Sequence, residues 1–298
     1  MAPEHRSRID GLLRTLELTD TGARTSADIF TGPSHWMPNG RVFGGQVLAQ
    51  AIRAASYTVA EGREIHSLHG YFVRPGDAAL PITFSVDRTH DGRSFSTRRV
   101  QAYQHGLPIL STLCSFQDDD PGLEHQAEMP ADLPEPETLQ SAHEFLGASD
   151  FEAMRRLASE FPFDLRHVPN SIYFTVDDEQ VAHQAVWTRA LGEMPDDQAI
   201  HRAALAYASD IGILEPIFRR HGIALTTPGV KTASLDHAMW WHRPFRVDEW
   251  LLFVTESPSA SGGRGLSLGH YFTRDGVLVA TVAQEGMVRH PRFAPPRS

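Results

Sequence analysis

The sequence of 298 residues has a single cysteine and no long apolar run. One cysteine, Cys114, excludes an intramolecular disulfide, so an oxidising compartment is not indicated. It lies in the apolar run LSTLCSF, which offers no electropositive neighbour to activate a thiol, so we expect it to be buried. Nowhere do about eighteen apolar residues follow one another, and charges interrupt the N-terminal segment. The C-terminal PRS does not match the peroxisomal S-K-L signal. We therefore expect a cytoplasmic protein with no membrane insertion.

Lysine is almost absent, because Lys231 is the only one and the other basic residues are arginine. The chain therefore lacks a phosphate-cradling G-x-x-x-x-G-K-S/T loop, and a Schiff-base mechanism would have to use Lys231. The formal net charge of −10 disfavours a nucleic-acid partner, since nucleic acids bind to basic surfaces. An anionic substrate remains compatible with this charge if arginines gather locally.

An acidic stretch with four prolines, DDDPGLEHQAEMPADLPEPE (118–137), divides the chain. It has no lysine or arginine and is typical of a solvated linker. The residues that follow, 138–161, have helical spacing and are predicted to pack on the surface between the halves. The predicted organisation is an N-terminal domain (1–117), a linker with a surface helix (118–165), a C-terminal domain (166–290) and a tail (291–298).

The two halves repeat one order of features. HSLHGYFVRP and ASLDHAMWWHRP are each followed by alternating runs and two turns, and the turns recur about 170 residues apart. Each half also has one helix with apolar residues on nearly every face, at 44–59 and 201–218, which predicts burial on all sides. We therefore predict an α+β protein with a double hotdog fold, in which two antiparallel sheets each wrap around one long buried helix.

Asp210 is the only charge on a stripe of the second helix that also holds Ala203, Tyr207, Leu214 and Ile217. A buried carboxylate is unfavourable without partners, and burial raises its pKa. Asp210 is therefore either a structural residue satisfied by hydrogen bonds or a general base tuned toward neutral pH.

Two more polar residues lie on predicted strands. On the last strand, alternation points Gln284 inward, where its amide could orient a water or a carboxylate. Ser234 opens the strand SLDHAMWWH, where alternation assigns it to the face of Asp236 and Trp240; a serine there can also be a tolerated small residue. Asp236 and His237 face opposite sides of the strand, so they cannot converge on one substrate.

The segment GLSLG (265–269) matches the G-x-S-x-G pattern of a nucleophilic serine. That nucleophile needs a strand, a strained turn and a helix, whereas GLSLG follows a GGR turn and leads into the run HYFTRDG. We therefore expect Ser267 to be an ordinary strand residue. No metal site is predicted, because His66 and His69 lie three apart on a presumed strand and face opposite sides.

Five blocks of the sequence resemble the acyl-CoA thioesterase II family, and they run through both halves. They are RVFGGQVLAQA (41–51), HSLHGYFVRPGD (66–77), YASD (207–210), SLDHAMWWHRPFRVDEWLL (234–252) and GVLVATVAQEGMVR (276–289). The resemblance implies a double hotdog fold and hydrolysis of fatty acyl-CoA to fatty acid and free CoA. It implies no cofactor apart from the CoA of the substrate, and a homodimer or larger homo-oligomer.

The resemblance also implies site residues. The family's catalytic aspartate, hydroxyl residue and glutamine correspond to Asp210, Ser234 and Gln284. We hypothesise that Asp210 takes a proton from a water held by Ser234 and Gln284, and that this water attacks the thioester carbonyl directly. The repeat places Cys114 near the position equivalent to Gln284, so only the second half would keep the catalytic set.

The oxyanion donors and the substrate-binding residues are further candidates, and two other functions are alternatives. Backbone N–H groups at a helix start are suited to stabilise the oxyanion, and Gly44 and Gly45 permit close approach there. Gly45, Gln46 and His69 are candidate substrate-binding residues. A hotdog-fold enoyl-CoA hydratase is one alternative, although its motif has a histidine where this chain has Glu215. A non-catalytic acyl-CoA binding protein is the other.

Overall fold

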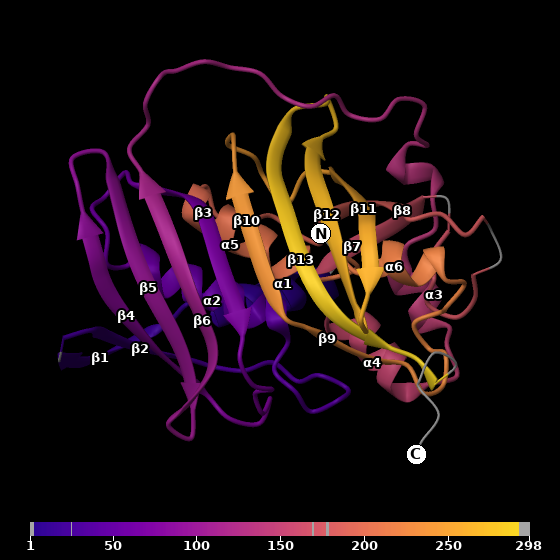
Figure 1. The fold of residues 1–298 in the computed structure, drawn as a ribbon, viewed down its shortest axis with the longest axis horizontal. Helices are drawn as coiled ribbons and strands as arrows, with labels where there is room; N and C mark the ends of the chain where they lie inside the picture. The colour runs from indigo at the N-terminus through magenta and orange to yellow at the C-terminus, as the bar shows by residue number, and fades with distance from the viewer. Residues whose placement is uncertain (1–2, 25, 169, 177–178, 292–298) are drawn as a thin grey trace.

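In the computed structural model, which describes residues 3–24, 26–168, 170–176 and 179–291, both halves belong to one antiparallel sheet of thirteen strands (Figure 1). The strands are β1 (Thr19–Arg24), β2 (Asp28–Gly32), β3 (Glu64–Phe72), β4 (Ile82–Asp91), β5 (Phe95–Gln104), β6 (Leu107–Gln117), β7 (Phe163–Val168), β8 (His183–Ala190), β9 (Lys231–Ser234), β10 (Asp236–Trp241), β11 (Leu251–Ser261), β12 (Arg264–Thr273) and β13 (Leu278–Arg289). The helices are α1 (Pro3–Leu16), α2 (Gly44–Ser56), the short 3-10 helix η1 (Pro136–Thr138), α3 (Ala142–Gly147), α4 (Glu152–Glu160), α5 (Gln198–Ser209) and α6 (Glu215–Arg220).

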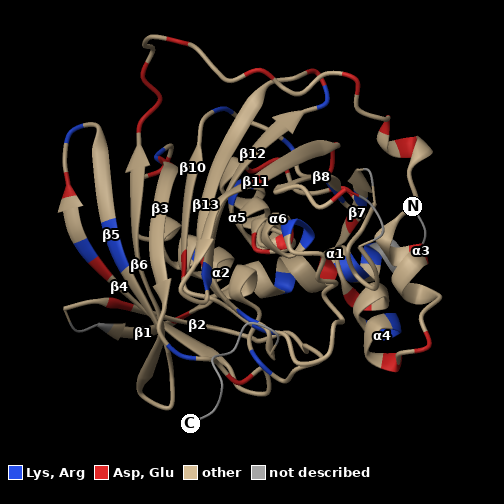
Figure 2. Cartoon of the chain, turned by 45° about the vertical axis from the view of Figure 1, so that its right-hand side comes forward, with Lys and Arg blue, Asp and Glu red and all other residues tan. Residues whose placement is uncertain are grey.

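The halves pair edge to edge at the centre of the sheet. The strand order is β1-β2-β4-β5-β6-β3-β10-β13-β12-β11-β8-β7, with β9 paired to β13. The antiparallel pair β3 and β10, with His69 opposite Ala238, joins the first half to the second. Both sheets curve around helices that lie on one side of them (Figure 2). The predicted double hotdog fold is confirmed, and its two sheets are continuous with each other through β3 and β10.

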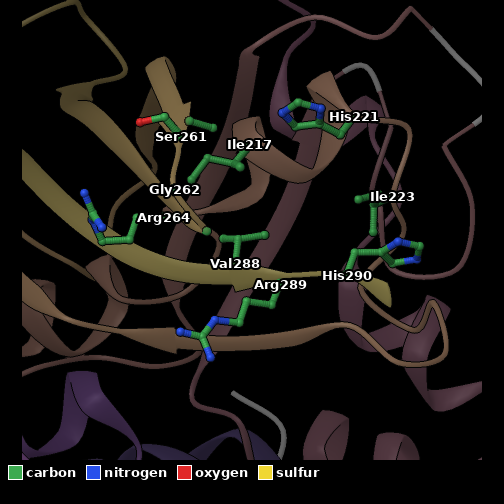
Figure 3. A pocket seen from close by; sticks show the side chains of 11 residues that line it. Ile217, His221, Ile223, Ser261, Gly262, Arg264, Val288, Arg289 and His290 are labelled. Carbon is green, nitrogen blue, oxygen red and sulfur yellow. The ribbon is translucent and has the colours of Figure 1, made fainter. Parts of the chain in front are cut away.

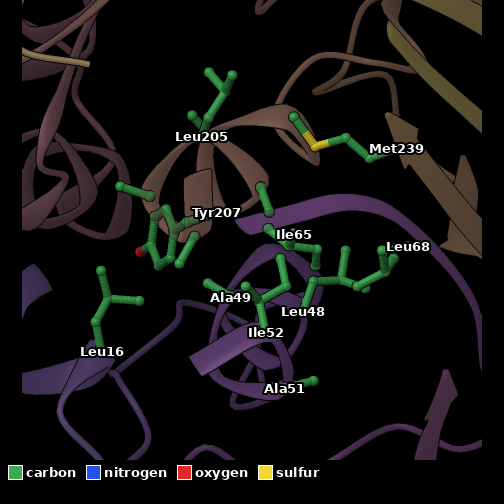
Figure 4. Packing of buried hydrophobic residues seen from close by; sticks show 14 of the residues in the cluster. Leu16, Leu48, Ala49, Ala51, Ile52, Ile65, Leu68, Leu205, Tyr207 and Met239 are labelled. Atoms are coloured by element: carbon green, nitrogen blue, oxygen red, sulfur yellow. The ribbon is translucent and has the colours of Figure 1, made fainter. Parts of the chain in front are cut away.

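The two central helices, α2 and α5, pack against each other and form the middle of the core. In α2 the only residues that are not buried are Gly44, Arg53 and Ser56. Such burial on nearly every face is what the apolar pattern predicts. Figure 4 shows side chains of both helices packed with side chains of β3 and β10, among them Leu48, Ile52, Leu205, Tyr207, Leu68 and Met239. Cys114 on β6 is also fully buried, as predicted.

The second buried helix is shorter than predicted. A single helix over 201–218 is wrong, because α5 ends at Ser209 and Asp210 is its C-cap residue. Gly212 then adopts a φ of +74°, a left-handed conformation that favours glycine and ends a helix. Leu214 therefore caps the start of α6 and does not continue the stripe of Ala203 and Tyr207. The break matters because it leaves Asp210 at the end of a helix.

The segment between the halves also differs in detail. Residues 118–135 have no helix or strand and cross from β6 to the second half as an exposed connection (Figure 1). The expected helix over 138–161 consists of α3 and α4, and β7 begins at Phe163, inside the segment assigned to the linker. Of the predicted tail, residues 292–298 lie outside the described residues. Among the described residues, no helix is long and apolar enough to span a membrane.

Candidate active site

Asp210, Ser234 and Gln284 meet at one point, although they come from three elements far apart in the sequence. The Ser234 hydroxyl donates to Asp210 Oδ1 at 3.2 Å, and Gln284 Nε2 donates to the same oxygen at 3.0 Å. Gln284 Nε2 also donates to Ser234 Oγ at 2.9 Å, which closes a triangle. The structure therefore brings together all three residues that the sequence resemblance singled out.

A backbone group from the first half completes the environment of Asp210. The Gly45 N–H, at the start of α2, donates to Asp210 Oδ2 at 2.9 Å. A Cβ atom on Gly44 would collide with Asp210 Oδ2, and one on Gly45 would collide with the Tyr207 carbonyl. The two glycines are thus needed for the start of α2 to approach the end of α5. The Gly45 N–H, expected to stabilise an oxyanion, instead holds the carboxylate.

The environment of Asp210 changes its acidity. Burial raises the pKa of Asp210 to about 6, while hydrogen bonds from Gln284, the Gly45 N–H and Ser234 stabilise the carboxylate and limit the rise. A carboxylate with a pKa near 6 is ionised at neutral pH and still basic enough to accept a proton from water. The pattern is that of a general base.

Ser234 reaches this site because the strand is interrupted beside it. The register of β13 shifts between its two partners: Ser234 of β9 lies opposite Gly286, whereas Ala238 of β10 lies opposite Ala283. Leu235 lies between the two strands. The expectation that Ser234 shares a face with Asp236 is therefore wrong. Asp236 points the other way and accepts a hydrogen bond from the Glu285 N–H at 2.7 Å.

The interruption also brings in a residue that the sequence reasoning set aside, His237. Its Nδ1 lies 2.5 Å from Gln284 Oε1, and its Nε2 lies 3.1 Å from the hydroxyl of Ser209. His237 is 1% exposed, and burial lowers its pKa to about 4, so the imidazole is neutral. The sequence contains both residues of this contact, the histidine of SLDH and the inward-facing glutamine. Strict alternation through Leu235, however, assigns Ser234 and His237 to opposite faces of the strand.

Two of the candidate substrate-binding residues lie elsewhere. Gln46 is fully buried, and its amide binds the Pro33 carbonyl, the His35 N–H and the amide of Gln50. These contacts anchor the segment before α2. His69 lies on the outer face of β3, exposed to solvent, with its ring edge-to-face against Trp240 at 5.0 Å between centroids. The structure does not bring either side chain to Asp210.

Ser267 is a strand residue, as expected. It lies within β12, opposite Gln284 of β13, and is fully buried. Its two glycine neighbours in the motif are also inside this strand, where a Cβ on Gly265 would meet Ile217 and one on Gly269 would meet Phe253. The glycines therefore make room for packing, and the strained turn of a nucleophilic serine is absent from this segment.

Two neighbouring pockets lie at this end of the molecule, and one of them reaches Ser234. One, of about 370 Å³, has Gly44 and Ser234 in its wall, and both residues contact or crowd Asp210. Its wall holds two arginines, Arg41 and Arg74, and no acidic residue. Both arginines are exposed, and neither forms an ion pair in the described part of the chain. The pocket thus carries positive charge on a chain whose net charge is negative.

The other pocket, of about 220 Å³, is almost entirely apolar. It shares Met37 and Phe43 with the first pocket, and Tyr207 and Ile211, on either side of Asp210 in the sequence, also line it. Helices α3 and α4 form its outer wall with Leu146, Leu157 and Ala158. The pocket with two arginines and the apolar pocket are therefore neighbours, and residues close to Asp210 in the sequence line the apolar one.

A third pocket, of about 680 Å³, is larger than both of these but lies apart from this site (Figure 3). Its wall contains Arg264, Arg289 and His290, and none of Asp210, Ser234 or Gln284. Arg264 is already paired with Glu285 at 3.0 Å. Volume alone thus does not identify the reaction centre. Among the described residues, no group of three or more histidine, cysteine, aspartate and glutamate side chains is arranged to hold a metal ion.

Comparison with known proteins agrees with this geometry. The acyl-CoA thioesterase family model matches residues 157–287, and the model of the acyl-CoA thioesterase N-terminal domain matches residues 33–117. Human acyl-coenzyme A thioesterase 8 is 39% identical over 274 residues, which cover 88% of this chain and 85% of that protein. Acyl-CoA thioesterase 2 of Haemophilus influenzae is 39% identical over 269 residues, covering 88% and 92%.

A solved structure agrees as well. The acyl-CoA thioesterase II of Mycobacterium marinum is 39% identical and superposes with a TM-score of 0.77, covering 95% of this chain and 100% of that chain. Sequence and fold lead to one conclusion: the chain belongs to the acyl-CoA thioesterase II family.

Proposed function

We propose that this protein hydrolyses fatty acyl-CoA by direct attack of a water that Asp210 activates with Ser234 and Gln284. The observation that carries the proposal is the carboxylate of Asp210, held by three groups, one of which, Ser234, lies in the wall of the pocket with two arginines. Membership of a thioesterase family supports the reaction class.

The hydrogen bonds indicate where the water binds. Asp210 Oδ1 accepts from Ser234 and Gln284, and Oδ2 accepts from the Gly45 N–H. A carboxylate has about four acceptor positions, so one position on Oδ2 is left for a water. The Ser234 oxygen, which donates to Asp210 and accepts from Gln284, retains a second acceptor position for the other hydrogen of that water. The water oxygen is then free to face the substrate.

The reaction needs no covalent intermediate on the enzyme. The water oxygen forms a bond to the thioester carbonyl carbon while its proton passes to Asp210. The carbonyl oxygen becomes an oxyanion, which the unpaired backbone N–H groups at the start of α2, beside Gly44, are suited to stabilise. When the carbon–sulfur bond breaks, the sulfur leaves as the CoA thiolate, and Asp210 returns its proton to solvent or to the thiolate.

The two pockets accommodate the two ends of the substrate. The phosphates of CoA are anionic, and Arg41 and Arg74 are the charged groups in the wall of the pocket that reaches Ser234. The acyl chain is apolar, and the neighbouring pocket beneath α3 and α4 offers apolar side chains. A thioester that spans the shared residues Met37 and Phe43 would place its carbonyl carbon beside Asp210.

The test is release of free thiol from a panel of acyl-CoA esters of increasing chain length. We expect wild-type protein to release thiol, and the variant Asp210→Asn to lose about 100- to 10,000-fold in kcat, the usual contribution of a general base. Asp236→Asn is the matched control, because Asp236 points to the opposite face and an asparagine can still accept from the Glu285 N–H. Near wild-type turnover in Asp210→Asn contradicts the assignment.

Other products would identify the alternatives. An acyl group on serine or cysteine, found by mass spectrometry after rapid quench, contradicts direct attack by water. Formation of 3-hydroxyacyl-CoA from enoyl-CoA without thiol release would indicate a hydratase, although Glu215 in α6 is 2% exposed and faces His167 at 3.4 Å. Saturable acyl-CoA binding with no turnover would indicate a binding protein.

We also propose that a second copy of the chain covers the outer face of the sheet near β3 and β10. Helices cover only the other side (Figure 2), and on the outer face Tyr71 is 66% exposed and Leu113 is 48% exposed. Exposed apolar faces of this kind are typical of interfaces between copies. Light scattering should show a dimer or larger assembly that Leu113→Glu weakens, and a monomeric wild-type protein contradicts the proposal. The cytoplasmic location and the absence of a cofactor stay predictions.

A further inference from the structure

A closed ring of hydrogen bonds lies behind the candidate catalytic residues. Gln284 Nε2 donates to Asp210 Oδ1 at 3.0 Å, and Gln284 Oε1 lies 2.5 Å from His237 Nδ1. His237 Nε2 lies 3.1 Å from Ser209 Oγ, and Ser209 precedes Asp210 in the chain, so the ring closes through the backbone. The ring joins the end of α5 to β10 and β13.

The chemistry of these groups determines where each hydrogen lies. A side-chain amide oxygen only accepts hydrogen bonds, so the proton of the neutral imidazole must be on Nδ1 of His237. Nε2 can then only accept, so the single hydrogen of the Ser209 hydroxyl is donated to Nε2 at 3.1 Å and not to its other acceptor, the Ala206 carbonyl at 2.9 Å. Ser209, His237 and Gln284 are each no more than 1% exposed, so no solvent competes for these contacts.

The orientation of the Gln284 amide decides whether the site works. In the observed orientation the NH2 group faces two acceptors, Asp210 Oδ1 and Ser234 Oγ. If the amide rotated by half a turn, its oxygen would face the carboxylate of Asp210, and its NH2 group would face the N–H of His237. Both contacts would be repulsive. The Nδ1–H of His237 therefore favours the single amide orientation that holds Asp210 and Ser234 in place.

The internal repeat supports a link between His237 and Gln284. SLHG (67–70) in the first half corresponds to SLDH (234–237) in the second, so Gly70 stands where His237 would be. Cys114 follows the turn glycine Gly106 at the same spacing as Gln284 follows Gly276. The half that lacks the glutamine thus lacks the histidine as well.

We propose that His237 is a positioning residue, which acts through Gln284 by fixing the amide orientation and is itself fixed by Ser209. The proposal rests on the proposed function only in that Gln284 orients Asp210 and Ser234, which hold the attacking water. His237 does not contact the water or the thioester, and its effect on catalysis passes through the amide.

The test compares two substitutions of His237 that differ in one donor. Asparagine carries its NH2 group on Cγ, as histidine carries Nδ1, so His237→Asn keeps a donor for Gln284 Oε1, whereas His237→Leu removes it. We expect kcat to fall by roughly 10- to 100-fold in His237→Leu with KM changed by less than about 2-fold, and to stay within about 5-fold of wild type in His237→Asn.

A matched control separates positioning from loss of a buried imidazole. His201 is also fully buried, and its Nδ1 accepts from the Val247 N–H without contact to Gln284. We expect both His201→Leu and His237→Leu to lower the melting temperature. Only His201→Leu should keep kcat near that of wild type. Wild-type kcat in His237→Leu, or an equal loss in His237→Leu and His237→Asn, overturns the proposal.

A second measurement does not depend on turnover. In protein labelled with nitrogen-15 at histidine, NMR should show His237 protonated at Nδ1, and Gln284→Leu should abolish this preference. Protonation of His237 at Nε2 in the wild-type protein overturns the proposal even if the enzyme is active. Absence of thiol release from wild-type protein contradicts the proposed function instead, and the NMR result still decides whether the ring forms.

Discussion

Replacing Asp210 with asparagine should change how the stability of the protein depends on pH while it removes activity. Burial raises the pKa of Asp210 from 3.8 to about 6 in the folded chain. Between these two values the folded state binds more protons than the unfolded state, so the free energy of unfolding falls as pH rises. Because one pKa unit corresponds to about 1.4 kcal/mol, ionised Asp210 destabilises the fold by about 3 kcal/mol above pH 6.

The substitution Asp210→Asn removes this effect, since asparagine does not ionise. It also leaves one partner, either the Gly45 N–H or the group at Oδ1, without its carboxylate acceptor, which costs about 1 to 3 kcal/mol at every pH. The difference in the free energy of unfolding between variant and wild type at a single pH is therefore less informative than the change of this difference with pH. From about pH 4.5 to about pH 8 the stability of Asp210→Asn relative to wild type should rise by about 2 kcal/mol.

Urea unfolding at several pH values measures this difference, provided that both proteins unfold in one transition with equal slopes. Asp236→Asn is the control, because the carboxylate of Asp236 lies on the opposite face of β10. The difference in the free energy of unfolding between this variant and wild type should not follow the pH dependence expected for Asp210→Asn. A difference between Asp210→Asn and wild type that stays constant from about pH 4.5 to about pH 8 would refute the reasoning. It would mean that Asp210 ionises in the folded protein as it does in the unfolded chain.

Three further predictions concern turnover and specificity. The value of kcat/KM should rise with pH through about 6 and then level off, because Asp210 must be ionised to accept a proton; a flat profile from pH 5 to pH 8 would exclude Asp210 as the base. Arg74→Gln should raise KM for acyl-CoA several-fold with little change in kcat, and the gap should shrink at high salt; an unchanged KM at low salt would remove Arg74 from the CoA path. Ala158→Phe should fill the apolar pocket and shift the preference in the chain-length panel toward shorter acyl groups, while Ala23→Phe, at an exposed position on β1, should not; an unchanged preference would place the acyl chain elsewhere.

Much of the fold could be predicted because it follows from local periodicity. The alternation along the last strand correctly pointed Gln284 inward, since β13 is a regular strand there. Apolar residues on every face of 44–59 correctly predicted a buried helix, and Cys114 was correctly placed in the core. Periodicity failed where the chain departs from a regular element: at Gly212, which ends α5 early, and at Leu235, which reverses the face of the residues after Ser234.

What the sequence determined by itself is thus the repeat of the two halves, a buried helix in each half and the three residues identified by family resemblance. Only the tertiary structure decided that the Gly45 N–H binds Asp210 across 165 residues of chain, and that His237 reaches Gln284 across 47. Residues that far apart meet because separate elements pack in one register, and no local period encodes that register. Asp210 has a basic, oriented carboxylate for this reason: the three groups that hold it come from three different parts of the chain.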